Sequence, residues 1–241
     1  MRLDDTSNSG AYSATLNVAA GPIVNTGLIE FTNSGGFGAG GRTLGADVVN
    51  RGSIVANHDA SVVATNLDTL AGGTLSAAAG ATLTIDTAST DLDASTVLSG
   101  AGTIDFAGTQ TINLVGSVAL NDPLLNVDFD GDVTFTATGT QTLTIGSGVD
   151  QEFREDVINS GLFVSGTVRI QTQTSPTGTS TVGGPLDVSG SGVLVVEGGR
   201  GQSFGNAVLA VASGFNNAGT LRLDDTSNSG AYSATLNVAS G

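Results

Sequence analysis

One group of side chains that could do chemistry is a run of three aspartates at alternate positions, Asp128, Asp130 and Asp132. Alternate residues of a β-strand point to the same face, so a strand here would carry three carboxylates that a cation could bring together. The run is no EF-hand, because that loop needs Gly at position six and Glu at position twelve, whereas this run has Gly131 fourth and Gly139 twelfth. We therefore predict a weak Ca²⁺ site at the three aspartates and no other cofactor.

Catalytic groups are scarce in this chain. His58 is its single imidazole, and no Ser lies beside it in a nucleophile motif such as G-x-S-x-G. Cys and Lys are absent, and the seven basic residues, all Arg, are scattered along the sequence. Nucleophilic and acid–base catalysis need such groups within hydrogen-bond reach of one another. The sequence therefore predicts no catalytic residue, and we expect the chain not to be an enzyme.

Threonine pairs at alternate positions form a second pattern. They are Thr82 with Thr84, Thr109 with Thr111, Thr140 with Thr142, and Thr172 with Thr174. If all pairs shared one outer face, they would form a flat array of hydroxyl and methyl groups, which resembles the ice-binding surfaces of some β-helical antifreeze proteins. The alternative is plain β-propensity, since Thr is favoured on any exposed pleated surface.

Four asparagines precede by two positions a glycine that opens a short run of alternating apolar residues: Asn25, Asn50, Asn159 and Asn217. Asn tolerates the left-handed backbone conformation of tight turns, and its side chain can hydrogen-bond the equivalent group in a neighbouring repeat. We predict that these four residues form structural turns or a ladder and take no part in binding.

The charge balance limits the partners. The chain has 22 acidic and seven basic residues and a net charge of −15, so nucleic acid and anionic bilayers repel it. None of its apolar runs is long enough for a membrane-spanning helix, which needs about 18 residues or more. We expect no nucleic-acid partner and no membrane insertion by this segment.

Glycine content sets the fold class. The 241 residues include 36 Gly, one in about 6.7 on average, and each Gly costs about 1 kcal/mol in a helix interior. Hydrophobic residues make up 39% of the chain, which is too many for a disordered one. The composition predicts a folded all-β protein.

The same segment occurs near both ends of the sequence. The segment RLDDTSNSGAYSATLNVA occurs at 2–19 and again, unchanged, at 222–239, so that Arg222 repeats Arg2. We interpret residues 1–220 as one tandem repeat and 221–241 as the start of the next, copying 1–21. The whole chain, 1–241, is expected to be one continuous solenoid cut from a longer array.

A shorter repeat lies inside the long one. A glycine opens each short alternating run, and eight such anchors divide the period into coils of similar length: Gly27, Gly52, Gly73, Gly102, Gly131, Gly161, Gly192 and Gly219. Runs such as Leu83-Thr84-Ile85 alternate apolar and polar residues, as strands do. Coils of this length with two or three short strands predict a parallel β-solenoid of about eight coils per repeat.

Segments such as NTGLIEF, NRGSIVAN, LSGAGTIDFAGTQTINL and NNAGTLRLDD carry a family resemblance. They resemble the degenerate repeats of bacterial surface β-helices, the filamentous-haemagglutinin-like adhesins and autotransporter passengers. The resemblance covers nearly the whole chain. It implies a right-handed parallel β-helix at the cell surface, with the export signal outside this fragment.

These patterns lead to a structural function as the first expectation. The chain would be a repeat module of a giant extracellular surface protein, building a stiff stalk, fibre or matrix by coil stacking. Its partners would be neighbouring repeats of the same chain or identical chains end to end. The alternatives are an adhesive module for a glycan, mineral or ice surface, helped by Ca²⁺, and, last, a polysaccharide-degrading β-helix enzyme.

Two segments are expected to form loops that leave the solenoid wall. Residues 35–45 are the most glycine-rich stretch and residues 150–156 the most charged. Loops on a rigid scaffold often carry binding residues. We therefore expect Phe37, Phe153 and Arg154 to be the first side chains available for a specific contact.

Overall fold

The chain is described from a computed structural model, which covers residues 1–7, 12–35, 40–129, 132–173, 176–199, 205–227 and 232–239. All secondary structure in these ranges is β, and the strands pair in parallel. The predicted fold class, an all-β parallel β-solenoid, is confirmed, with about nine turns along the chain. The chain divides into two compact units, which are described separately: unit 1 is 1–110 with 124–128, and unit 2 is 111–123 with 129–241.

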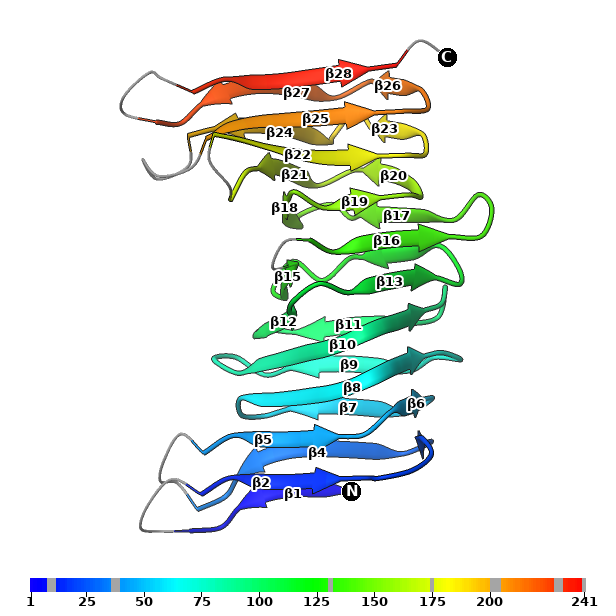
Figure 1. Ribbon diagram of the computed structural model, residues 1–241, viewed down its shortest axis with the longest axis vertical. Helices are drawn as coiled ribbons and strands as arrows, with labels where there is room; N and C mark the ends of the chain where they lie inside the picture. Colours follow the sequence, from blue (N-terminus) through cyan, green and yellow to red (C-terminus); the bar gives the residue numbers. More distant parts are fainter. Residues whose placement is uncertain are drawn as a thin grey trace. The chain divides into compact units, whose positions relative to one another are not determined.

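Unit 1 has two principal sheets (Figure 1). The first has the order β1 (Arg2–Asp5), β4 (Leu28–Asn33), β7 (Ser53–Ala56), β9 (Thr74–Ala77) and β11 (Val97–Gly100). The second contains β2 (Ala14–Asn17), β5 (Arg42–Gly45), β8 (Ala60–Thr69), β10 (Thr82–Leu92), β12 (Thr103–Phe106) and β15 (Asn126–Phe129), with β3 (Ile23–Asn25) and β6 (Val48–Asn50) beside them. The long strand β8 pairs with both β5 and β6, so two short strands of one coil merge into one strand in the next.

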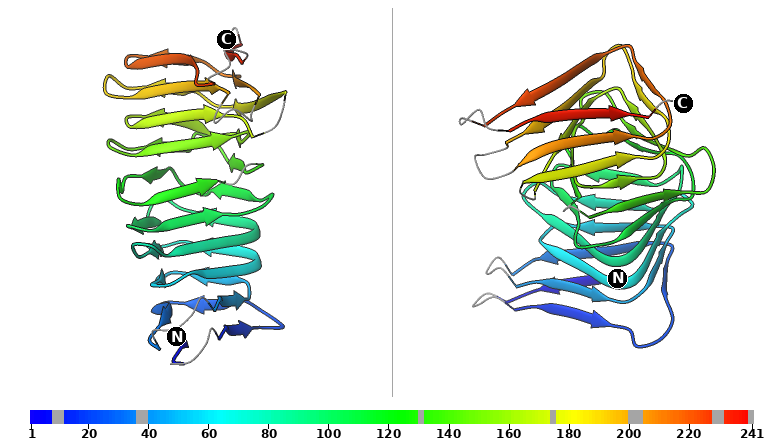
Figure 2. Two further views of the ribbon diagram at one scale, coloured as in Figure 1. Left: turned by 90° about the vertical axis from the view of Figure 1, so that its left-hand side faces the viewer. Right: turned by 45° about the horizontal axis from the view of Figure 1, so that its top comes forward.

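Unit 2 has three sheets, and each full coil adds one strand to each of them (Figure 2). One sheet contains β13 (Thr111–Leu114), β16 (Thr134–Ala137), β19 (Val157–Ile158), β22 (Thr177–Val182), β25 (Asn206–Val211) and β28 (Ala234–Val238). The second contains β14 (Val118–Leu120), β17 (Thr142–Ile145), β20 (Gly161–Val164), β23 (Leu186–Val188) and β26 (Phe215–Asn217). The third contains β18 (Asp150–Arg154), β21 (Thr167–Gln171), β24 (Val193–Gly198) and β27 (Thr220–Asp225).

The core of each unit consists of stacked rows of inward side chains. Ile54 and Leu75, for example, face one another in the register of β7 and β9 and are fully buried. Phe31 of β4 lies opposite Ala56 of β7, so a large and a small side chain share that row. Because neighbours in a row come from successive coils, each coil buries its apolar residues only against the coils next to it.

Several of the anchor glycines lie where successive coils approach one another closely. A Cβ atom at Gly52 would lie 2.2 Å from the carbonyl oxygen of Gly27, and one at Gly219 would lie 2.2 Å from that of Ser189. No side chain fits at such distances. The anchors Gly73, Gly102 and Gly192 are as tightly placed, so these glycines mark positions where one coil passes closely over the previous one, whereas a Cβ at Gly27 would meet nothing within 4 Å.

The segment 150–156 differs from the predicted loop. Residues Asp150–Arg154 form strand β18, in which Gln151 and Phe153 point inward and the charged residues alternate outward. Phe153 is fully buried and stacks on Phe129 with a centroid distance of 5.6 Å, while Phe135 meets both rings edge-on. The expectation that Phe153 is available for a contact is therefore wrong.

The other two side chains expected in loops have different outcomes. Arg154 closes strand β18, and its Nη2 contacts Glu152 Oε2 at 2.6 Å, so its guanidinium group already has an acidic partner. In the expected loop 35–45, residues Arg42–Gly45 form strand β5. Phe37 lies outside the described residues.

Candidate functional site

Asn25 and Asn50 form a buried side-chain ladder in unit 1. They face one another in the register of β3 and β6, and Asn25 Nδ2 donates to Asn50 Oδ1 at 2.7 Å. Each Oδ1 also accepts the backbone N–H of the glycine two residues later, Gly27 or Gly52. Asn50 Nδ2 donates in turn to the carbonyl of Thr74. The amides thus hold three successive coils in register through hydrogen bonds that satisfy them in the interior.

Asn159 and Asn217 lie in unit 2 and are exposed. Asn217 Oδ1 accepts the N–H of Gly219 at 3.1 Å, which is the same turn that Asn25 makes with Gly27. Asn159 lies in the turn between β19 and β20. The turn geometry of Asn217 is therefore the same as in unit 1, but no second asparagine lies over it in the described part of this chain.

The threonine pairs are spread over both units and several sheets. In unit 1, Thr82 and Thr84 are in β10, whereas Thr109 is exposed and outside the strands. In unit 2, Thr111 is in β13 and Thr142 in β17. Within unit 2, Thr111 and Thr142 therefore lie on separate sheets.

The remaining threonines also depart from an outer array. Thr140 is exposed and lies before β17, outside the strands. Thr172 is buried and donates to Glu155 Oε1 at 2.8 Å. Thr174 lies outside the described residues. The flat surface of hydroxyl and methyl groups stays a prediction, although Thr109 and Thr140 lie outside the strands and Thr172 is buried.

The predicted metal ligands are only partly described. Asp128 is a residue of β15, which ends at Phe129, and Asp132 lies outside the strands with a positive φ of 60°. Asp130 lies outside the described residues. Within the described ranges, no group of three or more His, Cys, Asp or Glu side chains is placed to hold a metal ion. The Ca²⁺ site at Asp128, Asp130 and Asp132 stays a prediction.

Asp156 is a buried carboxylate that the sequence did not reveal. It is fully buried in the connection between β18 and β19, where its oxygens accept the N–H groups of Val133 and Arg154 at 3.1 and 2.8 Å. Burial raises the pKa of Asp156 to about 7, against the opposing effect of these two hydrogen bonds. The nearby Asp132 also raises this pKa. Asp156 is therefore a group of unit 2 that titrates near neutral pH.

A charged cluster lies on the outer side of β18, β21 and β24. Arg169 contacts both oxygens of Asp150 at 3.0 to 3.2 Å and also Glu197 at 3.1 Å. Glu197 is almost buried and accepts a further hydrogen bond from Gln171 Nε2 at 2.6 Å. The hydrogen bond with Asp150 is the main reason why the pKa of Arg169 is raised. Within this cluster, the guanidinium group offsets the acidic charges.

His58 is held against a buried arginine. Arg42 is fully buried, and its Nε donates to the carbonyl of Thr32 at 2.9 Å, while Nη1 contacts Gly40 O and lies 3.3 Å from His58 Nδ1. A guanidinium has only donors, so Nδ1 must act as the acceptor here. Arg42 Nη2 has no hydrogen-bond partner among the described residues. His58 therefore helps to satisfy a buried cation.

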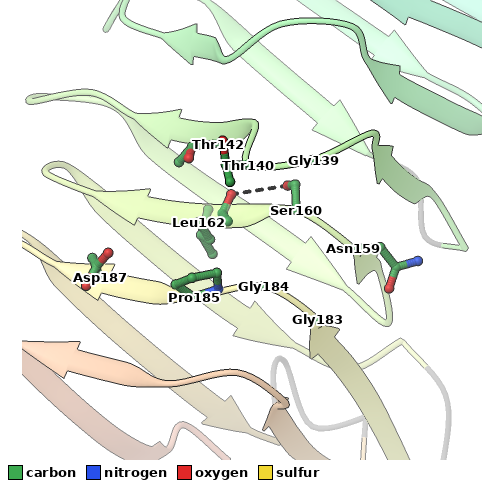
Figure 3. A pocket seen from close by; sticks show the side chains of 11 residues that line it. Gly139, Thr140, Thr142, Asn159, Ser160, Leu162, Gly183, Gly184, Pro185 and Asp187 are labelled. Atoms are coloured by element: carbon green, nitrogen blue, oxygen red, sulfur yellow. Dashed lines mark hydrogen bonds between the residues drawn. The ribbon is translucent and has the colours of Figure 1, made fainter.

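A hollow of about 410 Å³ opens on unit 2 where three coils turn a corner (Figure 3). Its floor includes Gly161, Gly183 and Gly184, which have no side chains to fill the space. Thr142 and Asp187 contribute polar groups from β17 and β23, and Asp187 also accepts the amide of Asn216 at 2.7 Å. Asp187 is the only titratable side chain among the described residues that line the hollow.

In their described residues, the two identical segments make the same hydrogen bonds at an aspartate. Asp5 Oδ1 accepts the N–H of Ser7 at 2.8 Å, and Asp225 Oδ1 accepts the N–H of Ser227 at the same distance. Both aspartates also accept the N–H of the following tyrosine, Tyr12 or Tyr232. What differs is the neighbour: β1 pairs with the later strand β4, whereas its copy β27 pairs with the earlier strand β24.

No protein-family model matches the chain, and neither a curated protein nor a solved structure matches it significantly. Among the described residues, no helix is long and apolar enough to cross a membrane. The fold, a parallel β-solenoid with an internal tandem copy, is therefore what the chain itself establishes.

Proposed function

We propose that the chain is a structural repeat module of an extracellular surface protein, which builds a stiff stalk or fibre by stacking coils. One observation carries this proposal. The same segment pairs with a following coil at 2–19 and with a preceding coil at 222–239. A segment that accepts a neighbour on either side is what a continuous tandem stack requires.

The mechanism is mechanical. Strands in a sheet lie about 4.8 Å apart, so the eight coils expected in one tandem repeat, residues 1–220, advance a rod by about 38 Å. Each coil contacts only its neighbours, so length grows with copy number while the local packing stays the same. The net charge of −15 keeps neighbouring rods apart unless cations screen it.

The test compares chains that contain one, two and three copies of the tandem repeat 1–220. Small-angle X-ray scattering should show a maximum dimension that grows by about 38 Å for each added copy, because each copy adds its coils to the same stack. A dimension that grows much less, or copies that scatter as independently tumbling bodies, would exclude the stalk.

An adhesive function is the second candidate, and the hollow beside Thr142 and Asp187 is the observation that favours it. A small polar ligand such as a sugar would contact those two side chains. Asp187→Ala should then abolish binding to a glycan array, whereas Asp91→Ala, on unit 1, should leave it unchanged. Equal binding by both variants would remove this candidate. Catalysis forms no part of either proposal.

A further inference from the structure

We propose that the hollow of unit 2 binds one uncharged pyranose residue of a glycan, with the ring of Phe163 as the stacking platform and Asp187 as an acceptor for the hydroxyl groups. The inference rests on the adhesive function, the second candidate above, and does not depend on the stalk. It adds to that function a ligand class and a residue that determines specificity.

The hollow contains a gap in an outward row of side chains. In the register of β17 and β20, Thr142 lies opposite Gly161. Leu162 lies opposite Leu186, so Gly161 in turn lies opposite Pro185. Figure 3 shows Thr142 and Pro185 on the two sides of the coil that contains Leu162. Because Gly161 has no side chain, a gap opens between Thr142 and Pro185, and all three residues line the hollow.

Phe163 provides an apolar surface beside this gap. It is the second residue after Gly161 in β20, so both residues are on the outward face of the strand. Phe163 is 37% exposed, and its register neighbours are Thr144 and Asp187. Neighbouring strands lie about 4.8 Å apart, so a ligand held at Asp187 is within reach of the aromatic ring. An exposed aromatic ring is a flat apolar surface on which another ring can stack.

Asp187 and Thr142 provide the polar side of the hollow. Asp187 Oδ1 accepts a hydrogen bond from Asn216 Nδ2 at 2.7 Å, and this bond orients the carboxylate. Among the described residues, Asp187 Oδ2 and Thr142 Oγ1 have no hydrogen-bond partner. An ionised carboxylate only accepts hydrogen bonds, whereas a hydroxyl group both accepts and donates. A ligand in the hollow must therefore present donors to Asp187 and can present either kind of group to Thr142.

A pyranose ring matches both sides of the hollow. One face of the ring carries C–H groups that can pack on Phe163, and the rim carries hydroxyl groups that can donate to Asp187. The same hydroxyl groups can accept a hydrogen bond from Thr142, which an ammonium group cannot do. An acidic sugar is repelled by Asp187 and by the net charge of −15. An uncharged sugar is therefore the ligand that fits this set of groups.

The size of the hollow agrees with a single sugar residue. Its volume of about 410 Å³ lies near the lower end of the roughly 300–1,000 Å³ that small-molecule sites occupy. The gap at Gly161 is bounded by Thr142 in the coil before and by Pro185 in the coil after. These boundaries favour the end or one residue of a glycan over a long segment of it.

Saturation-transfer NMR of the full chain with simple sugars tests the site directly. The probes are the methyl pyranosides of glucose, galactose, mannose and N-acetylglucosamine. We expect at least one of them to bind, with the strongest saturation on the C–H protons of one ring face, because that face lies on Phe163. If none of them binds at up to about 50 mM, or if saturation is uniform over the ring, the proposal is overturned.

Two substitutions of Phe163 separate stacking from simple apolar contact. Phe163→Leu keeps an apolar side chain without a flat ring, so it should weaken binding roughly three- to tenfold and remove the contrast between the ring faces. Phe163→Tyr keeps the ring and should bind within about twofold of the unaltered chain. Tyr12→Leu is the matched control, because it removes an exposed ring of unit 1 and should leave binding unchanged. If Phe163→Leu binds as the unaltered chain does, or if Tyr12→Leu loses as much affinity, Phe163 is not the platform.

Gly161→Val tests the gap in the row. Gly161 lies in strand β20 without a positive φ, so a β-branched residue suits its backbone. A Cβ atom there would lie 3.1 Å from Thr142 Oγ1, a contact that a small shift of the threonine side chain relieves. The added methyl groups occupy the gap, so binding should be lost while the melting temperature is retained. Unchanged binding by a folded Gly161→Val chain would overturn the proposal, and the Phe163 variants test it independently of this substitution.

Charged derivatives of the sugar that binds best test the ligand class. The uronic acid should bind at least roughly tenfold more weakly than the uncharged sugar, and the amino sugar no more tightly. Binding of the uncharged sugar should be the same at about 50 and 500 mM NaCl, because no ion pair forms. An amino sugar that binds roughly tenfold more tightly, and more weakly as salt is added, would show that the hollow is a cation site instead.

A glycan array separates this inference from the adhesive function on which it rests. Array binding that is lost in Asp187→Ala but unchanged in Phe163→Leu would overturn the stacking platform and leave the adhesive function standing. Array binding that is lost in Asp187→Ala and weakened in Phe163→Leu supports both. If the unaltered chain binds neither the array nor any of the methyl pyranosides, both fail, and the scattering of linked copies still tests the stalk on its own.

Discussion

The two units hold their coils together by different chemistry. Unit 1 aligns its coils with a neutral amide ladder, Asn25 to Asn50, beside rows of aliphatic side chains such as Ile54 and Leu75. Unit 2 contains the cluster of Phe129, Phe135 and Phe153 together with the buried carboxylate of Asp156. Parallel coils in this chain therefore stack both over an aliphatic interior with an amide ladder and over an aromatic interior with a buried carboxylate. The comparison leads us to expect that unit 2 responds to pH and that unit 1 responds much less.

The largest effect is expected from the aromatic cluster. Phe153→Ala should lower the stability of unit 2 by about 3 to 5 kcal/mol, because it removes a fully buried ring that stacks on Phe129 and leaves a cavity. Hydrogen exchange followed by mass spectrometry would report this loss in the strands of unit 2. Phe163→Ala is the control: Phe163 is 37% exposed, so its loss should be much smaller. If the two variants lose similar stability, the aromatic cluster contributes no more to the stability of unit 2 than the partly exposed Phe163 does.

The second effect is the pH response of unit 2. The pKa of Asp156 is about 7 in the folded chain and 3.8 as the ordinary value, so between these values the folded chain holds a proton that the unfolded chain releases. Asp156 therefore stabilises the fold fully only at low pH, and this stability is lost as the pH rises towards and through 7. The expected loss between pH 5 and pH 8 is about 2 to 4 kcal/mol.

Urea unfolding at several pH values would measure this response, and Asp156→Asn provides the matched comparison. The amide resembles the protonated acid, so the variant should keep its stability at pH 8 and have a flatter profile. All other acidic groups are retained in it, so the difference between the two profiles isolates Asp156. Parallel profiles for the two chains would show that Asp156 stays ionised, and the contrast between the units would disappear.

The third effect concerns the ladder of unit 1. Asn50→Ala removes the acceptor of Asn25 Nδ2 and of Gly52 N–H and the donor to Thr74 O, all in the interior. We expect a loss of about 1 to 3 kcal/mol, with no change in the pH profile because no charged group is involved. Asn217→Ala is the control in the single chain, since Asn217 is exposed and should change stability by less than about 0.5 kcal/mol. Hydrogen exchange would measure both losses of stability. If Asn50→Ala and Asn217→Ala lose the same stability, the asparagine ladder does not stabilise unit 1.

Features that depend on steric necessity could be predicted from the sequence. The anchor glycines were visible because a side chain at Gly52 or Gly219 has no room, and the alternating runs were visible because a strand has a period of two. The Asn-x-Gly turns at Asn25 and Asn217 follow from the same local chemistry.

Features that depend on the length of individual corners could not be predicted. The step along the chain between paired strands is short from Asp150 to Thr167 and much longer from Thr177 to Asn206. Threonines at similar offsets from their anchors therefore fall on different sheets. Strand β18 was missed because its charged residues hid the alternation of inward and outward side chains, and the burial of Asp156 leaves no local signal.

The smallest effect links the predicted calcium site to the pH response. Asp132 raises the pKa of Asp156, so a cation bound at Asp132 would offset that charge and lower this pKa. For a site with a dissociation constant near 1 mM, about 1 mM Ca²⁺ stabilises the fold by about 0.4 kcal/mol. The midpoint of the pH profile should move down with Ca²⁺ and not with Mg²⁺, and Asp130→Asn should abolish the shift. If Ca²⁺ moves the midpoint in that variant as well, general screening of the acidic surface is sufficient and the three aspartates hold no specific ion.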